Sequence, residues 1–147
     1  MQTAANTTTT RAGALASKLV PARDGREDAV QRLADYLNAA EQEGTLSAQT
    51  ARTAWLAWSG LEKALWVHAG ALLPVPDACP GADGQLLYTW RRGEHYLELE
   101  VFADRPGELF YRNGKTGALW EAELTVAAAE GATAVTPEIT TRLALFA

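Results

Sequence analysis

Apolar and polar residues alternate through most of the segment 85–126. Leu86, Tyr88 and Trp90 occupy every second position, and Leu97 and Leu99 continue the pattern in a later run. A period of two places alternate side chains on opposite faces of a strand, as a half-buried antiparallel sheet requires. Turn sequences, of which Asn113-Gly114 is the strongest hairpin signal, separate the runs. We therefore predict a four-stranded antiparallel meander at 85–92, 95–102, 108–112 and 117–126.

Residues 24–43 and 47–73 carry apolar residues at helical spacing instead. Asp24 and Glu27 form a loosened capping box, and Gly44 suits the end of the first helix. Ser47 suits the start of the second helix, and the prolines that follow residue 73 would end it. The apolar stripes predict two antiparallel helices on one face of the sheet. The stripe residues are Val30, Leu33, Leu37 and Ala40 in the first helix and Ala54, Trp58, Leu61, Leu65 and Leu72 in the second.

The two ends of the chain differ in character. Residues 1–22 are rich in Thr and Ala without periodicity, so we expect a disordered tail. Thr136-Pro137 resembles a helix start, which predicts a short C-terminal helix over 137–146. The segments 75–82 and 127–134 have linker composition. The expected architecture is a single α+β domain spanning 23–147.

The charge distribution limits the kind of partner that the chain would bind. The 147 residues have a formal net charge of −5, and the part from Pro74 onward holds 6 basic and 11 acidic residues. This excess favours a protein partner with a basic surface over a nucleic acid. Cys79 is the only cysteine, which suits the cytoplasm, and no apolar run approaches the ~20 residues of a membrane span.

Candidate catalytic chemistry is sparse. His68 shares a helix face with Leu61 and Leu65, which predicts a partly buried structural histidine, and His95 at a strand start is expected at the surface. Two histidines and one cysteine without close spacing do not favour a zinc site. No serine or cysteine lies in a nucleophile motif, and no glycine-rich loop suits a phosphate. We therefore expect no catalytic residue, metal site or cofactor.

The best candidate binding surface is the polar side of the second strand. Tyr96, Glu98, Glu100 and Phe102 alternate onto the face opposite the apolar residues, and Glu121 and Glu123 repeat the acidic pattern on the fourth strand. Aromatic residues are favoured at interfaces, so we predict a mixed acidic and aromatic binding strip. In the alternative, the C-terminal helix covers this strip.

The helix residues Trp55 and Trp66 are further candidates. With Trp58 they place three tryptophans on one helix, and most of them are expected in the core. An exposed indole at Trp55 or Trp66 would instead anchor a partner.

A longer pattern resembles a small group of bacterial proteins. It runs from Leu73-Pro74-x-Pro76 through Asp83-Gly84-x-Leu86-x-Tyr88-x-Trp90 to Leu97-Glu98-Leu99-Glu100, and the likeness extends over about residues 45–113. In these mostly uncharacterised proteins helices lead into an antiparallel meander, and some are similar to partners of toxins or defence enzymes. The resemblance implies a scaffold and no catalytic residues. Ten Arg against three Lys also suits a bacterial chain.

These observations lead to a hypothesis of a non-enzymatic interaction module, an accessory or antitoxin-like subunit that binds another bacterial protein. One alternative is a small-molecule-binding domain or enzyme, with a pocket between sheet and second helix lined by Trp58, Trp66 and Trp90. Another is a dimeric chaperone for an exported effector, which would form a homodimer through its helices or strand edges. The sequence leaves open which sheet edge is free.

Overall fold

A computed structural model describes residues 21–147, with side chains from residue 25 onward. The chain divides into two compact units, residues 1–32 and residues 33–147. Most of the predicted tail 1–22 lies outside the described residues. Helix α2 spans Pro21–Gln42, so Asp24 lies inside the helix and not at its cap. Proline is favoured in the first turn of a helix, where its missing N–H is not needed.

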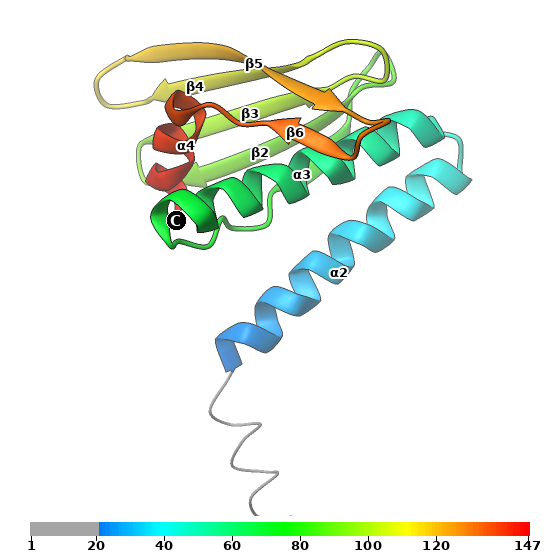
Figure 1. The fold of residues 1–147 in the computed structure, drawn as a ribbon, viewed down its shortest axis with the longest axis horizontal. Coiled ribbons are helices and arrows are strands. Elements are labelled where there is room, and N and C mark those ends of the chain that lie inside the picture. The colour runs from blue at the N-terminus through cyan, green and yellow to red at the C-terminus, as the bar shows by residue number, and fades with distance from the viewer. Residues whose placement is uncertain (1–20) are drawn as a thin grey trace, which may run out of the picture. The chain divides into compact units, whose positions relative to one another are not determined.

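The second unit contains a six-stranded antiparallel sheet in the order β1-β2-β3-β4-β5-β6 (Figure 1). The predicted meander is present, but the expected number of four strands is wrong. Each strand pairs with the next one along the chain. Their bounds are Asp77–Pro80 (β1), Leu86–Arg92 (β2), His95–Val101 (β3), Gly107–Asn113 (β4), Leu119–Ala127 (β5) and Ala132–Ala134 (β6).

The two additional strands, β1 and β6, lie in the segments that we expected to be linkers. Their residues, Asp-Ala-Cys-Pro and Ala-Thr-Ala, show no strong alternation and have low β-propensity. They are strands because the outer edges of β2 and β5 offer unpaired backbone groups to a nearby extended segment. Pro80 is tolerated because β1 is an edge strand.

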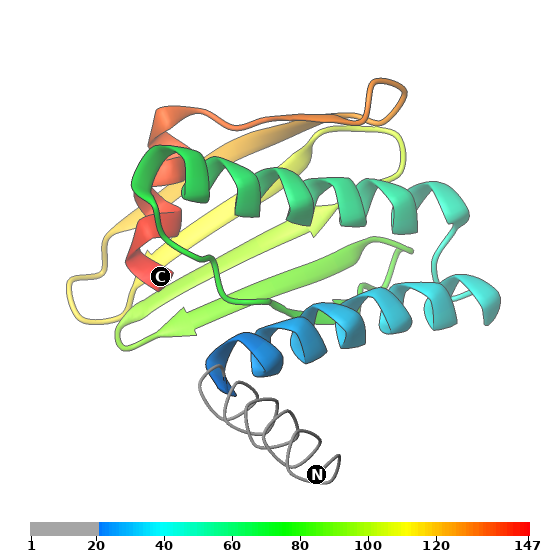
Figure 2. The ribbon, with the colours of Figure 1, turned by 60° about the horizontal axis from the view of Figure 1, so that its bottom comes forward.

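Helix α3 spans Ala48–Ala69 and crosses one face of the sheet (Figure 2). Its start matches the prediction, since the Ser47 side chain accepts a hydrogen bond from the Thr50 N–H. Its end comes before the predicted Leu73, at Gly70, whose φ of 61° is left-handed and whose N–H is bonded to the Trp66 carbonyl. Glycine adopts this conformation at little cost and so ends the helix before the prolines are reached.

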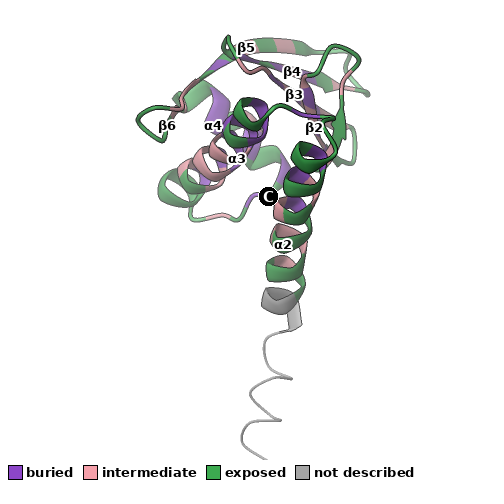
Figure 3. Cartoon of the chain, turned by 90° about the vertical axis from the view of Figure 1, so that its right-hand side faces the viewer, coloured by how far each residue is buried: buried purple, intermediate pink, exposed green. Residues whose placement is uncertain are grey.

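The core lies between α3 and the inner face of the sheet, where Figure 3 shows buried residues gathered. The α3 stripe is buried at Ala54, Trp58, Leu61 and Leu65. Leu72 lies beyond the helix and is 53% exposed. The alternation of β2 and β3 is confirmed, because their predicted inward residues are all buried. These are Leu86, Tyr88, Trp90, Leu97 and Leu99.

The C-terminal helix has two parts, α4 at Pro137–Leu143 and a 3-10 turn at Ala144–Phe146. The Thr136 side chain caps it by accepting a hydrogen bond from the Ile139 N–H, as predicted. Ile139, Leu143 and Phe146 are buried, and α4 contacts α3. The helix therefore belongs to the layer on the inner face of the sheet. No described helix has the length and apolar character needed to cross a membrane.

Candidate functional site

The strand register gathers carboxylates on the outer face of the sheet. Glu100, Glu108 and Glu123 lie directly opposite one another across β3, β4 and β5. In the next row, Glu98 and Glu121 lie on either side of Phe110. We call the five glutamates, with Phe110 at their centre, the acidic face. Local alternation places each glutamate outward, and the antiparallel register brings the strands together.

The acidic face is open and slightly hollowed. Glu108, Glu121 and Glu123 are exposed, while Glu98 and Glu100 are partly buried. The five glutamates, Phe110, Leu109 and Ala122 line a hollow of about 560 Å³. Within residues 21–147, no group of three or more His, Cys, Asp or Glu side chains is arranged to hold a metal ion. The face thus offers closely spaced negative charge around an aromatic ring, without the geometry of a metal centre.

Tyr96 borders the acidic face on β3. Its hydroxyl donates a hydrogen bond to Glu98 Oε2 at 2.5 Å, and the guanidinium groups of Arg91 and Arg112 lie 4.9 Å and 5.7 Å from its ring centroid. Desolvation and the bond to the Glu98 carboxylate raise the Tyr96 pKa to about 12, against the opposing effect of the two arginines. The phenol therefore remains a donor at neutral pH and orients Glu98.

The predicted strip on β3 is present as a continuous feature. Tyr96, Glu98 and Glu100 alternate along the strand, and Phe102 follows directly after its end. Arg105 lies over the Phe102 ring at 3.8 Å from its centroid. The alternative that the C-terminal helix covers the strip does not hold, because α4 packs with α3 on the inner face. Glu108 was missed by the sequence reasoning, although its outward position follows from the same alternation on β4.

The two candidate tryptophans do not join this strip, because α3 lies on the other face of the sheet. Trp66 is 57% exposed near the end of α3, beside exposed Val67. Trp55 is partly buried and lines a groove with Leu37 and Arg52. Each could serve only a surface separate from the acidic face.

The three tryptophans that were expected to line a pocket between the sheet and α3 do not lie together. Trp58 and Trp90 are 1% and 3% exposed, whereas Trp66 is on the exposed side of α3. The Trp90 indole donates a hydrogen bond to the Pro74 carbonyl, and the Tyr88 hydroxyl donates one to the Ala54 carbonyl. These groups are used in packing the core.

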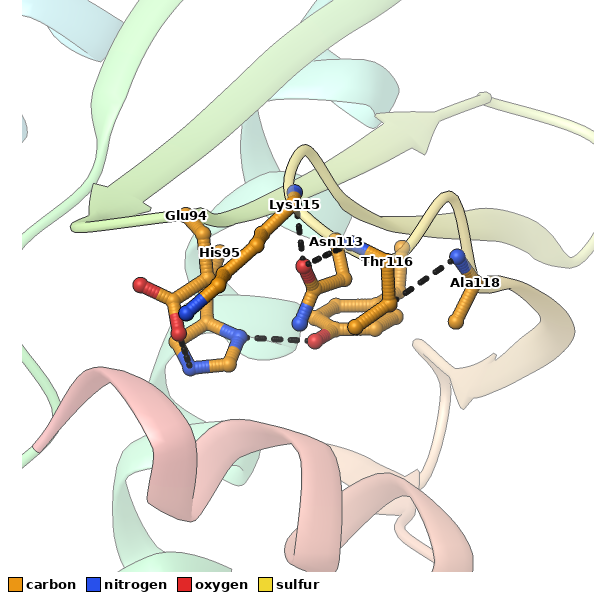
Figure 4. Close-up of polar contacts among 7 residues, drawn as sticks. Glu94, His95, Asn113, Lys115, Thr116 and Ala118 are labelled. Carbon is orange, nitrogen blue, oxygen red and sulfur yellow. Dashed lines mark hydrogen bonds and ion pairs between the residues drawn. The ribbon is translucent and has the colours of Figure 1, made fainter.

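The two histidines both differ from expectation. His68 is exposed because the last turn of α3 extends past the buried part of the stripe, which ends at Leu65. His95 is only 21% exposed, and its Nδ1 lies 2.7 Å from the Tyr111 hydroxyl (Figure 4). Its Nε2 lies 3.9 Å from a Glu94 carboxylate oxygen.

The His95 cluster has a structural explanation. Tyr111 is buried, at 6% exposed, and its hydroxyl is engaged by His95. The His95 ring stacks on Tyr111 and meets the edge of Phe146, which connects β3 and β4 to the end of the chain. In the neighbouring turn, Asn113 Oδ1 accepts hydrogen bonds from the N–H groups of Lys115 and Thr116 (Figure 4). This cluster therefore secures one end of the sheet.

Comparisons with known proteins identify no relative: no protein-family model matches the chain, and neither a curated protein nor a solved structure matches it.

Proposed function

We propose that this protein is a non-enzymatic interaction module, an accessory or antitoxin-like subunit that binds a basic surface of another protein through its acidic face. The observation that carries the proposal is the row Glu100–Glu108–Glu123, in which like charges oppose one another across adjacent strands. Such pairs destabilise a sheet. A basic partner would turn this unfavourable repulsion into attraction and would speed association.

The aromatic groups on the same surface support the same proposal. Phe110 lies in the middle of the acidic face, and Tyr96 and Phe102 are at its border on β3. Aromatic residues are enriched at protein interfaces and among their hot spots. The chemistry of the surface thus combines steering by charge with apolar anchoring.

Affinity purification of the tagged chain from its own host, followed by mass spectrometry, tests the proposal. We expect one stoichiometric partner with a basic surface. The double variant Glu98→Lys and Glu100→Lys should no longer bind this partner, because the reversed charges repel its basic surface. A matched double variant, Glu43→Lys and Glu130→Lys, changes the net charge equally at exposed positions away from the sheet face. It should retain the partner.

Equal loss of the partner in both double variants would show that only net charge matters and would contradict the proposed face. Retention in both would contradict it as well. Circular dichroism of all the variants establishes that loss of binding is not loss of folding.

A further inference from the structure

Among residues 21–147, no strand pairs with part of the β5 edge. Strand β6 pairs only with Thr125–Ala127, while β4 pairs with Leu119–Leu124 from the other side. Figure 1 shows the chain turning away from β6 toward α4. Within the described residues, the outer side of Leu119–Leu124 is therefore left without a paired strand. Such an edge can accept an extended segment of another chain by strand addition.

The register shows which backbone groups point outward. The Asn113 N–H is bonded to the Ala118 carbonyl at 2.9 Å, so this opposing pair is a hydrogen-bonded one. Bonded and non-bonded pairs alternate along an antiparallel ladder. Trp120 and Ala122 therefore bond to β4. The N–H and C=O groups of Leu119, Glu121 and Glu123 point toward the free edge.

The same residues place their side chains on the acidic face. A strand added at this edge would set residues opposite Glu121 and Glu123, with Cβ atoms about 4.5–5.5 Å away. Basic side chains at those alternate positions would meet the two carboxylates. Intervening residues would lie on the inner side near Trp120, whose ring has the Arg142 guanidinium 5.1 Å from its centroid. That side suits uncharged residues.

A second copy of the chain fits this edge poorly. Antiparallel pairing of two β5 edges would bring Glu121 and Glu123 of one copy beside the same glutamates of the other. Like charges directly opposite each other on neighbouring strands are destabilising. Charge complementarity therefore favours a basic segment.

We infer that the free edge at Leu119–Glu123 binds an extended segment of the partner as a seventh strand, antiparallel to β5 like the other pairs of the sheet. In this segment basic residues alternate with uncharged ones. This inference rests on the proposed function and adds its binding mode. Backbone hydrogen bonds to Leu119, Glu121 and Glu123 would provide affinity. The alternating basic side chains on the acidic face would provide specificity.

Two short fluorescent peptides of alternating lysine and valine test the inference directly. In one, the lysine amides are N-methylated; in the other, the valine amides are. The charge is the same, but only lysine methylation blocks the hydrogen bonds that an antiparallel strand with its lysines on the acidic face would make to β5. We expect fluorescence anisotropy at low ionic strength to show about tenfold weaker binding of the lysine-methylated peptide, the effect of losing one or two backbone bonds.

Variants of the protein provide a second measurement with the unmethylated peptide. Glu121→Pro removes an edge N–H that β4 does not use, and proline is tolerated at such edge positions. Glu121→Gln removes the same charge but keeps the N–H. We expect Glu121→Pro to bind about tenfold more weakly than Glu121→Gln. If Glu121→Pro does not fold, the comparison of the two methylated peptides still tests strand addition at the β5 edge.

Equal affinity for both methylated peptides would overturn strand addition and indicate binding by charge alone. A dimer of the free chain in analytical ultracentrifugation that Glu121→Pro dissolves would overturn it too, since a second copy would then occupy the edge. The affinity purification from the host separates the two ideas. If the double variant Glu98→Lys and Glu100→Lys loses the natural partner while Glu121→Pro still binds it, only the edge inference is overturned. Retention by the lysine double variant would instead contradict the proposed function itself.

Discussion

At the scale of single residues, two tyrosines bury their hydroxyl groups, but only one of these hydroxyls has a hydrogen-bond partner in the described part of the chain. The Tyr88 hydroxyl donates a hydrogen bond to the Ala54 carbonyl at 2.9 Å, and the residue is 0% exposed. The Tyr36 hydroxyl oxygen is buried without a hydrogen-bond partner in the described part of the chain. Burial raises the pKa of both phenols. Burying a polar group costs free energy unless it is bonded.

We expect opposite effects when each hydroxyl is removed. Tyr88→Phe should lower the free energy of unfolding by about 1 kcal/mol because a satisfied internal hydrogen bond is lost. Tyr36→Phe should leave stability unchanged or raise it, because no bond is lost and a desolvated hydroxyl disappears. Urea denaturation of both variants measures this. Equal destabilisation would show that Tyr36 has a partner.

Tyr96 gives a prediction in alkaline solution. Its folded pKa of about 12 exceeds the ordinary value of 10.0, so above pH 10 the folded state holds the proton more tightly than the unfolded state. The free energy of unfolding therefore falls as pH rises from 10 toward 12. Tyr96→Phe should make this fall shallower, as measured by denaturation at several pH values. An unchanged slope would show that the Tyr96 pKa is not raised in the folded state.

At the scale of elements, the contact of α3 with β6 depends on one glycine. A Cβ on Gly60 would overlap the Thr133 side chain, and the Thr133 hydroxyl donates a hydrogen bond to the Leu56 carbonyl at 2.8 Å. Glycine inside a helix ordinarily costs ~1 kcal/mol relative to alanine. Here it allows the close approach that holds a short strand of low β-propensity.

Gly60→Ala should therefore destabilise the protein by about 1–3 kcal/mol, against the helix preference, because β6 must move to avoid overlap. Gly25→Ala in α2 is the matched control, since nothing lies within 4 Å of its added Cβ. It should stabilise by up to ~1 kcal/mol. Hydrogen exchange should also become faster at Ala132 and Thr133 in Gly60→Ala alone. If Gly60→Ala stabilises the protein, the close contact is absent in solution.

At the scale of the whole molecule, the binding role that we propose for the acidic face would come at a cost in stability. Glu108 lies between Glu100 and Glu123 in the row of like charges. Glu108→Gln should raise the free energy of unfolding by roughly 0.5 kcal/mol at low ionic strength. The gain should shrink in high salt, which screens exposed charges. Thermal denaturation at two salt concentrations measures this, with Glu130→Gln in the β5–β6 turn as control.

The same substitution should weaken partner binding, because it removes charge that the basic surface would meet. A variant that is both more stable and binds better would argue against the face as an interface. An effect equal to that of Glu130→Gln would show that the row has no special energetic role.

The sequence by itself determined the central meander, its turns and the face on which the side chains of β2 and β3 lie. Alternation and helical spacing are local properties, and at Leu97, Glu98 and Leu99 they assign inside and outside without knowledge of the neighbours. The caps at Ser47 and Thr136 were equally local. The same alternation assigned Tyr96, Glu98 and Glu100 to the outer face.

Only the tertiary structure decided what depends on the neighbours in space. Strands β1 and β6 have weak patterns of their own and form where an adjacent edge offers hydrogen bonds. His68 is exposed because the last turn of α3 extends past the buried part of the helix. Glu108 joins the acidic row because β4 lies between β3 and β5. The pairing of β1 and β6, the exposure of a sheet edge and the cross-strand charge row are relations between separate segments, so no local pattern in the chain could specify them.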